Sequence, residues 1–105
     1  MSALEGMHFV AGRVEQGGGE PFHGIDPKSG AELAPAYREA TGEQIERAAQ
    51  AAGAAAAEFA ATSPQQRAAL LRAIGDGLDA LGDTLVERCS AETALPAARI
   101  NGERA

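Results

Sequence analysis

The side chains that could act as a nucleophile or bind a metal ion are few in this 105-residue chain. Cys89 is its single cysteine, and its two histidines are His8 and His23. A catalytic thiolate needs a nearby base or a positive environment, whereas Cys89 falls at a buried position of an expected helix, which favours an inert thiol. The histidines could face each other across two strands, but without a third ligand they make a poor metal site. We therefore assign no catalytic residue and no metal ligand.

The run of three glycines at residues 17–19 is a further candidate site, because the N–H groups of a glycine-rich loop can hold a phosphate. A dinucleotide-binding loop would need another glycine and a helix directly behind it. Here Pro21 begins an extended stretch, and the chain holds no Gly-Lys-Ser/Thr sequence. The run is therefore predicted to be a flexible hairpin loop, and we assign no cofactor-binding residue.

The elements that must position any site differ between two parts of the chain. Residues 1–40 hold most of the turn formers, with a tight turn expected at residues 27–30. We expect three extended stretches, at residues 8–14, 22–26 and 31–38, the second of which alternates apolar and polar side chains as a half-buried strand would. Pro35 favours an edge position or a bulge for the last of these. This part is expected to be a short antiparallel meander.

Residues 41–105 have the pattern of about four helices. Two of them begin at capping boxes, in which a hydroxyl and a glutamine three residues later each satisfy a backbone N–H of the other. The first box pairs Thr41 with Gln44, and the second pairs Ser63 with Gln66. The expected fold class is therefore an α+β fragment, a short meander followed by about four helices.

The second helix carries the best apolar stripe of the sequence. The stripe comprises Leu70, Leu71, Ile74, Leu78 and Leu81. Gly82 is predicted to end this helix and Asp83 to cap the third. Pro96 precedes the fourth helix, which runs to Ala105 without a terminating residue, as expected of a chain cut within an element.

The composition is rich in alanine and poor in large apolar side chains. Alanine supplies 25 of the 105 residues, whereas Leu, Ile, Val and Phe together supply 18. That share lies below the level of about 20% at which a self-sufficient core becomes doubtful. The alanine-rich faces, chiefly at residues 48–61, suit close contact with a larger body, so the composition indicates an incomplete unit.

Charge and hydropathy exclude several classes of partner. The net charge is −6, Lys28 is the only lysine, and no basic cluster exists, which argues against nucleic acid. No run approaches the roughly 20 apolar residues of a membrane span, and the first residues lack the pattern of a signal peptide. A single cysteine excludes an intrachain disulfide. The expected chain is cytoplasmic and has no membrane partner.

Several local strings resemble the amino-terminal portion of the NAD(P)-dependent aldehyde dehydrogenase superfamily. Phe-Val-Ala-Gly at residues 9–12 is similar to the family's first strand, and residues 25–31 are similar to its Asn-Pro-Ala-Thr-Gly-Glu turn, with Asp26 in place of Asn. Residues 64–74 resemble its Arg-Ala-x-Leu-Leu-x-x-Ile helix. Residues 92–96 resemble its Glu-Thr-Gly-Lys-Pro string, with Ala94 in place of Gly.

Other strings resemble one branch of that family, the α-ketoglutarate semialdehyde (2,5-dioxovalerate) dehydrogenases. These strings lie at residues 35–37, 78–83, 92–96 and 98–104. The resemblance implies an NAD(P)-dependent enzyme that oxidises 2,5-dioxovalerate to 2-oxoglutarate. In such enzymes a cysteine thiolate forms a thiohemiacetal with the aldehyde, and hydride passes to NAD or NADP.

The resemblance covers only about the first fifth of a family member, so it implies that the catalytic cysteine and the cofactor domain lie beyond residue 105. Cys89 matches no catalytic motif of the family. The resemblance further implies that residues 41–105 pack on the absent cofactor-binding domain of an α/β fold, behind a meander at residues 1–40. It implies a homo-oligomeric parent enzyme and no cofactor bound by this chain alone. Arg99 and Arg104 would lie near an anionic substrate.

Two interpretations follow, which belong to different classes of protein. The first is an amino-terminal fragment of an aldehyde dehydrogenase that is inactive alone and has the remainder of the same enzyme as its partner. The second is a standalone α+β module that binds another protein through its alanine-rich helix faces. A reading frame that continues past Ala105 into a catalytic cysteine would favour the first. Sharp two-state unfolding of the isolated chain would favour the second.

Overall fold

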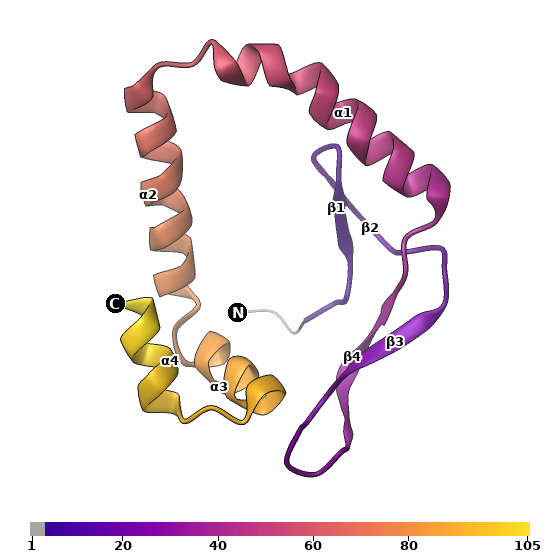
Figure 1. Ribbon diagram of the computed structural model, residues 1–105, viewed down its shortest axis with the longest axis vertical. Coiled ribbons are helices and arrows are strands. Elements are labelled where there is room, and N and C mark those ends of the chain that lie inside the picture. The colour runs from indigo at the N-terminus through magenta and orange to yellow at the C-terminus, as the bar shows by residue number, and fades with distance from the viewer. Residues whose placement is uncertain (1–3) are drawn as a thin grey trace. The chain divides into compact units, whose positions relative to one another are not determined.

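A computed structural model describes residues 4–105, which form two β-hairpins followed by four helices (Figure 1). The strands are β1 (His8–Val10), β2 (Arg13–Glu15), β3 (Pro21–Ile25) and β4 (Glu32–Arg38). The helices are α1 (Gly42–Ala60), α2 (Pro64–Ala80), α3 (Gly82–Thr93) and α4 (Ala97–Arg104). The expected α+β fold class is confirmed.

The strands do not form one continuous meander, because β1 pairs only with β2 and β3 only with β4. The stretch at residues 8–14, expected to be a single strand, is itself a hairpin that turns at Ala11 and Gly12. Both turn residues have positive φ, 51° and 78°, which reverses the chain after only three strand residues. In the resulting antiparallel register Phe9 lies opposite Val14.

The second hairpin, β3–β4, matches the expected strands and turn closely. Its turn is closed by the Asp26 N–H, which donates to the Ala31 carbonyl at 2.9 Å, and by the Gly30 N–H, which donates to the Asp26 carbonyl at 2.8 Å. Pro35 lies in β4, and a strand of a two-stranded sheet always has one free edge where a proline is tolerated.

Both capping boxes are present. The Thr41 hydroxyl accepts from the Gln44 N–H at the start of α1, and the Ser63 hydroxyl accepts from the Gln66 N–H at the start of α2. The side-chain oxygen of each glutamine accepts in turn from the backbone N–H of its capping residue. These two helices therefore begin where the local sequence predicts.

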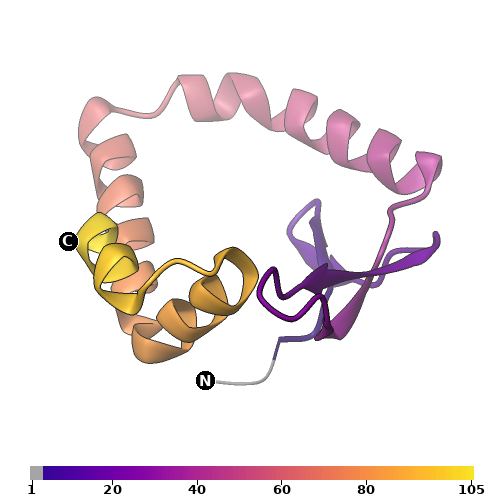
Figure 2. The ribbon, with the colours of Figure 1, turned by 60° about the horizontal axis from the view of Figure 1, so that its bottom comes forward.

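The junction between α2 and α3 differs from the sequence-based prediction that Gly82 ends α2 and Asp83 caps α3. Gly82 has a φ of +56° and allows the chain to turn after α2, but Asp83 does not cap α3. The N-cap position is Leu81, with no side-chain hydrogen bond, and Asp83 lies within the first helical turn, where a carboxylate favours the helix dipole. After Ala94 ends α3, α4 folds back against it (Figure 2).

The chain divides into two compact units, and each has a very small apolar core. Among the described residues, one unit comprises residues 4–23 and 34–62, and the other comprises residues 24–33 and 63–105. Among residues 4–105 the buried apolar side chains are Val10 in the first unit and Val86 and Ile100 in the second, at 5%, 4% and 9% exposure. In the same described range, no helix is long and apolar enough to cross a bilayer.

Candidate functional site

A pocket of about 330 Å³ lies in the second unit, where the β3–β4 turn meets α3 and the start of α4. It is lined by Asp26, Lys28, Val86, Glu87, Ser90, Ala91 and Ala97. The turn positions Asp26 rigidly, because its carboxylate accepts the Lys28 N–H at 2.8 Å. That bond is the main reason why the pKa of Asp26 lies below its ordinary value, so the carboxylate is ionised at neutral pH.

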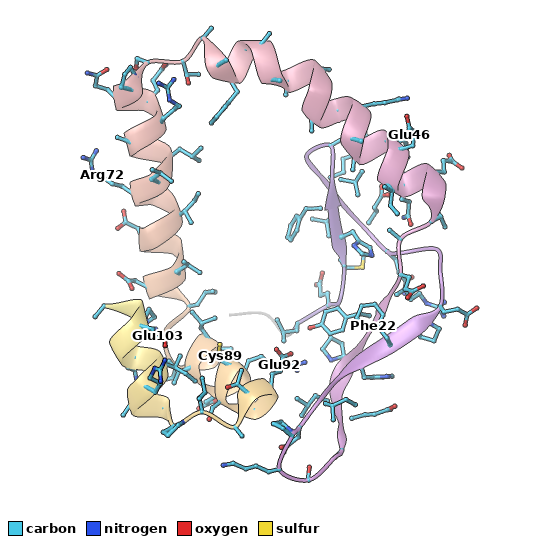
Figure 3. The ribbon with its side chains drawn as sticks, in the orientation of Figure 1. Phe22, Glu46, Arg72, Cys89, Glu92 and Glu103 are labelled. Atoms are coloured by element: carbon cyan, nitrogen blue, oxygen red, sulfur yellow. The ribbon has the colours of Figure 1, made fainter. Side chains whose placement is uncertain are left out.

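The pocket carries one cation and two carboxylates but no pair that could perform nucleophilic catalysis. Its hydroxyl, that of Ser90, donates to the Leu95 carbonyl at 2.7 Å and holds the end of α3. Cys89, on the same helix, is half-buried, and its carbonyl accepts from the Thr93 hydroxyl at 2.6 Å (Figure 3).

The structure does not bring the two histidines together as a cross-strand pair, because β1 and β3 belong to separate sheets. His8 donates through Nε2 to the Arg38 carbonyl at 2.7 Å, which ties β1 to the end of β4. Within residues 4–105 no three or more His, Cys, Asp or Glu side chains gather in a way that could hold a metal ion.

Arg99 and Arg104 both lie on α4 and contact different groups. Arg99 Nε is 2.7 Å from Glu103 Oε1, in an exposed ion pair one helical turn apart. Arg104 Nη1 donates to the Gly82 carbonyl at 3.1 Å and is half-buried. Five residues of α-helix separate the two positions by about 140° around the axis, so α4 does not present them as a two-arginine clamp.

The glycine run at residues 17–19 is not a hairpin loop, because it links β2 to β3, which lie in different sheets. Its N–H groups are used within the chain, with that of Gly18 donating to Gln44 Oε1 at 3.0 Å and that of Gly19 to the Glu39 carbonyl at 2.8 Å. A Cβ on Gly17 would overlap the carbonyl oxygens of Arg38 and Glu39. The glycines therefore permit close packing, and the N–H groups of Gly18 and Gly19 are already used within the chain.

Gln44 is the residue that joins this loop to α1. Its Oε1 accepts from the N–H groups of Thr41 and Gly18, and its Nε2 donates to Glu15 Oε1 at 3.1 Å and to the Gln16 carbonyl at 2.9 Å. The capping pattern accounts for one of these four bonds. The other three depend on where β2 and the glycine run lie, which the local sequence does not specify.

Glu15 is also held by Arg47, whose Nη2 lies 2.6 Å from Glu15 Oε1. The Arg47 hydrogen bond is the largest cause that lowers the pKa of Glu15, and the bond from Gln44 adds to it. The same contact raises the pKa of Arg47. Since the folded pKa of Glu15 lies below its unfolded value, the contact stabilises the first unit above about pH 4.5 and is lost as the pH falls through the folded pKa.

We expect the carboxyl of Glu15 to titrate below the ordinary glutamate value of 4.5, as followed by its side-chain NMR resonance during acidification. Arg47→Met should raise that midpoint towards the ordinary value, because the charged hydrogen bond is removed. Arg13→Met, which removes a charge from the same strand as Glu15, serves as the control. An unchanged midpoint in Arg47→Met would show that the ion pair does not set the acidity of Glu15.

Comparison with known proteins places this chain in a family. Residues 14–104, nearly its whole length, match the aldehyde dehydrogenase family. The chain belongs to the aldehyde dehydrogenase family. It is 38% identical over 102 residues to alpha-ketoglutaric semialdehyde dehydrogenase 2 of Azospirillum brasilense. That alignment covers 96% of this chain and 19% of the relative.

This aldehyde dehydrogenase chain is also 31% identical over 103 residues to alpha-ketoglutaric semialdehyde dehydrogenase of Acinetobacter baylyi, strain ATCC 33305 / BD413 / ADP1, with 98% of the chain and 20% of that relative covered. The chain thus spans about one fifth of the length of the curated relatives that it matches. The family match at residues 14–104 includes the β3–β4 hairpin and all four helices described above.

Proposed function

We propose that this chain is the amino-terminal part of an NAD(P)-dependent aldehyde dehydrogenase that oxidises α-ketoglutaric semialdehyde (2,5-dioxovalerate) to 2-oxoglutarate. The observation that carries the proposal is the match over 96–98% of the chain to two enzymes named for that substrate. The chain acts as a structural part of the enzyme, which works in the cytoplasm as a homo-oligomer.

The cofactor and the reacting thiol belong, in this proposal, to the part of the enzyme that the chain does not span. The glycine run does not fit a dinucleotide phosphate, because its N–H groups donate to Gln44 and Glu39. Cys89 is half-buried on α3, and no base lies among its hydrogen-bond partners in the described residues. We expect the isolated chain to bind neither NAD nor NADP and to have no dehydrogenase activity.

The helical part, residues 41–105, packs on the cofactor-binding domain. The many exposed large apolar side chains support this arrangement, since a soluble monomer seldom leaves so many uncovered. The proposal is tested by expressing the complete coding sequence and assaying it with the semialdehyde and either NAD⁺ or NADP⁺. A reading frame that ends without a cofactor-binding domain would overturn the proposal and favour the interaction module. An intact enzyme that is inactive on this aldehyde would do the same.

Arg99 and Arg104 lie, we propose, near the carboxylate of this anionic substrate. In the complete enzyme, Arg99→Ala and Arg104→Ala are each expected to raise the KM for the acidic semialdehyde about 5- to 10-fold, the loss of roughly 1 kcal/mol of charge interaction. The KM for a neutral aldehyde of similar length should change less than 2-fold.

The control for this prediction is Arg72→Ala, which removes the same charge from α2 and should leave both KM values unchanged. An equal rise for acidic and neutral aldehydes would contradict the substrate role. For Arg104 such an equal rise would point instead to its bond with the Gly82 carbonyl, which fixes α4 to the start of α3.

A further inference from the structure

The side chain of Asn101, on α4, has no part in the fold or in the proposed function. Asn101 is the only asparagine of the chain, and it is followed directly by Gly102. Both residues are exposed, and the Asn101 side chain makes no hydrogen bond within residues 4–105. Nothing in the described part of the chain therefore fixes this amide or shields it from water.

An asparagine followed by glycine is the dipeptide that loses its side-chain amide most readily. The backbone nitrogen of the second residue attacks the side-chain Cγ of the first, and a Cβ on the second residue hinders that approach. Gly102 has no Cβ, and a Cβ built there would meet nothing within 4 Å apart from the backbone of its own helix. The nitrogen of Gly102 and the Cγ of Asn101 therefore face no obstruction from other elements.

The helix around the pair controls when these two atoms can meet. In α4 the Gly102 N–H is directed at the carbonyl of Ala98, four residues earlier, and a helical ψ at Asn101 holds the nitrogen away from Cγ. Ring closure therefore requires a local opening of α4. The helix has only eight residues, and its N-cap residue, Pro96, provides no side-chain hydrogen bond. A helix of that length is not stable without contacts to other elements.

Two contacts hold α4 against α3. Ile100 is buried, at 9% exposure, and Arg104 Nη1 donates to the Gly82 carbonyl at 3.1 Å. One of these residues precedes the Asn-Gly pair and the other follows it closely. Loss of either contact therefore frees the backbone at the pair itself.

We propose that Asn101 is a site of spontaneous deamidation, at a rate set by local opening of α4. Solvent takes the proton of the Gly102 N–H, and the nitrogen forms a bond to Asn101 Cγ. The Cγ–Nδ2 bond breaks, Nδ2 takes a proton from solvent and leaves as ammonia, and a succinimide remains. Water then opens the ring at one of its two carbonyl carbons, which gives aspartate or isoaspartate with no change of oxidation state. The inference does not depend on the proposed function.

Both products weaken the contact between α4 and α3. A carboxylate at position 101 lies three residues before Arg104, at the spacing of a helical ion pair, and competes with the Gly82 carbonyl for the guanidinium. Isoaspartate adds one methylene to the backbone and interrupts the regular hydrogen bonds of the helix. Deamidation therefore changes the end of α4 that carries Arg104.

The test is incubation of the 105-residue chain at neutral and mildly alkaline pH, followed by mass spectrometry of its peptides and enzymatic methylation of isoaspartyl groups. Asn101 should be converted faster at the higher pH, because the attacking nitrogen must be deprotonated. Gln16, which also precedes a glycine but would have to form a larger ring, should remain an amide.

Glycine substitutions test the attacking group. Gly102→Ala should slow the conversion about 10-fold or more, because the added Cβ hinders the nitrogen, and alanine also favours the helix. Gly53→Ala is the matched control, since it makes the same change inside α1, where a Cβ likewise meets nothing within 4 Å. It should leave the rate at Asn101 unchanged.

Arginine substitutions test the control by α4. Arg104→Met removes the bond to the Gly82 carbonyl and should accelerate deamidation about 5-fold through easier opening of the helix. Loss of a nearby positive charge would by itself slow deprotonation of the nitrogen, so an acceleration can only come from opening. Arg99→Met removes the same charge from α4 without breaking a contact to α3, and its rate should equal or fall below that of the wild type.

Three results would overturn the proposal. An Asn101 amide that survives in the chain while a synthetic peptide of residues 97–105 is fully converted would exclude the site. Equal rates in the wild type and in Gly102→Ala would exclude attack by the Gly102 nitrogen. A rate in Arg104→Met no higher than in Arg99→Met would exclude control by the opening of α4. None of these measurements uses dehydrogenase activity, so their outcome leaves the proposed function untouched.

Discussion

The isolated 105-residue chain is expected to lose its helical circular dichroism gradually on heating, without a cooperative transition. The physical reason is its very small core, because the apolar side chains buried among residues 4–105 are only Val10, Val86 and Ile100. Burial of a large apolar side chain contributes roughly 1.5–3 kcal/mol, so three buried side chains give little apolar free energy to make unfolding cooperative.

Three measurements check this expectation. Far-ultraviolet circular dichroism should show a broad slope, calorimetry should show no heat-absorption peak, and a dye that binds exposed apolar surface should already fluoresce before heating. The matched control is the chain bound to the rest of an aldehyde dehydrogenase, where a single transition should appear. A sharp unfolding of the isolated chain at the same temperature by two probes would contradict the expectation and favour an autonomous module.

Replacement of Gln44 by Leu is expected to release the glycine run from α1. The substitution removes four hydrogen bonds made by one side-chain amide, to Thr41, Gly18, Glu15 and Gln16. At about 1 kcal/mol for each bond, the free energy that holds the loop closed should fall by roughly 2–4 kcal/mol. Amide hydrogen exchange at Gly18 should then accelerate by at least ten-fold.

Gln66→Leu is the control that the sequence itself offers. Gln66 completes the same capping box with Ser63 at the start of α2, but within residues 4–105 it has no glycine run to hold. Its replacement should cost only the roughly 1 kcal/mol of a lost cap. Equal acceleration of exchange at the two helix starts would show that the contacts of Gln44 with the loop contribute nothing beyond capping.

The features that the sequence predicted well are those that depend on neighbours only a few residues away. Thr41 and Ser63 cap their helices with partners three positions along, and the turn at residues 27–30 closes within its own hairpin. In such cases the local chain contains both groups of each hydrogen bond, so propensity and spacing are sufficient.

The features that the sequence did not predict depend on contacts between distant residues or on the φ angles of single residues. Residues 8–14 are predicted to be one short strand, but positive φ at Ala11 and Gly12 reverses the chain. The partners of Arg99 and Arg104 show the same difference between local contacts, which the sequence predicts, and distant contacts, which it does not. The pair with Glu103 follows from helical spacing, whereas the bond from Arg104 to Gly82 crosses between helices and has no signal in the sequence.

The exposed helix faces also bear on how such a chain is made. In the proposed enzyme, with a length like that of its relatives, this chain would wait tens of seconds for its covering surfaces, because ribosomes add about 5–20 residues each second. Helices α1 and α2 can begin during that wait, because their caps need only adjacent residues. Alanine exposes little apolar area, and a net charge of −6 makes nascent chains repel one another. In the proposed enzyme, the same composition that gives this chain so small a core would limit aggregation until the remainder of the polypeptide emerges.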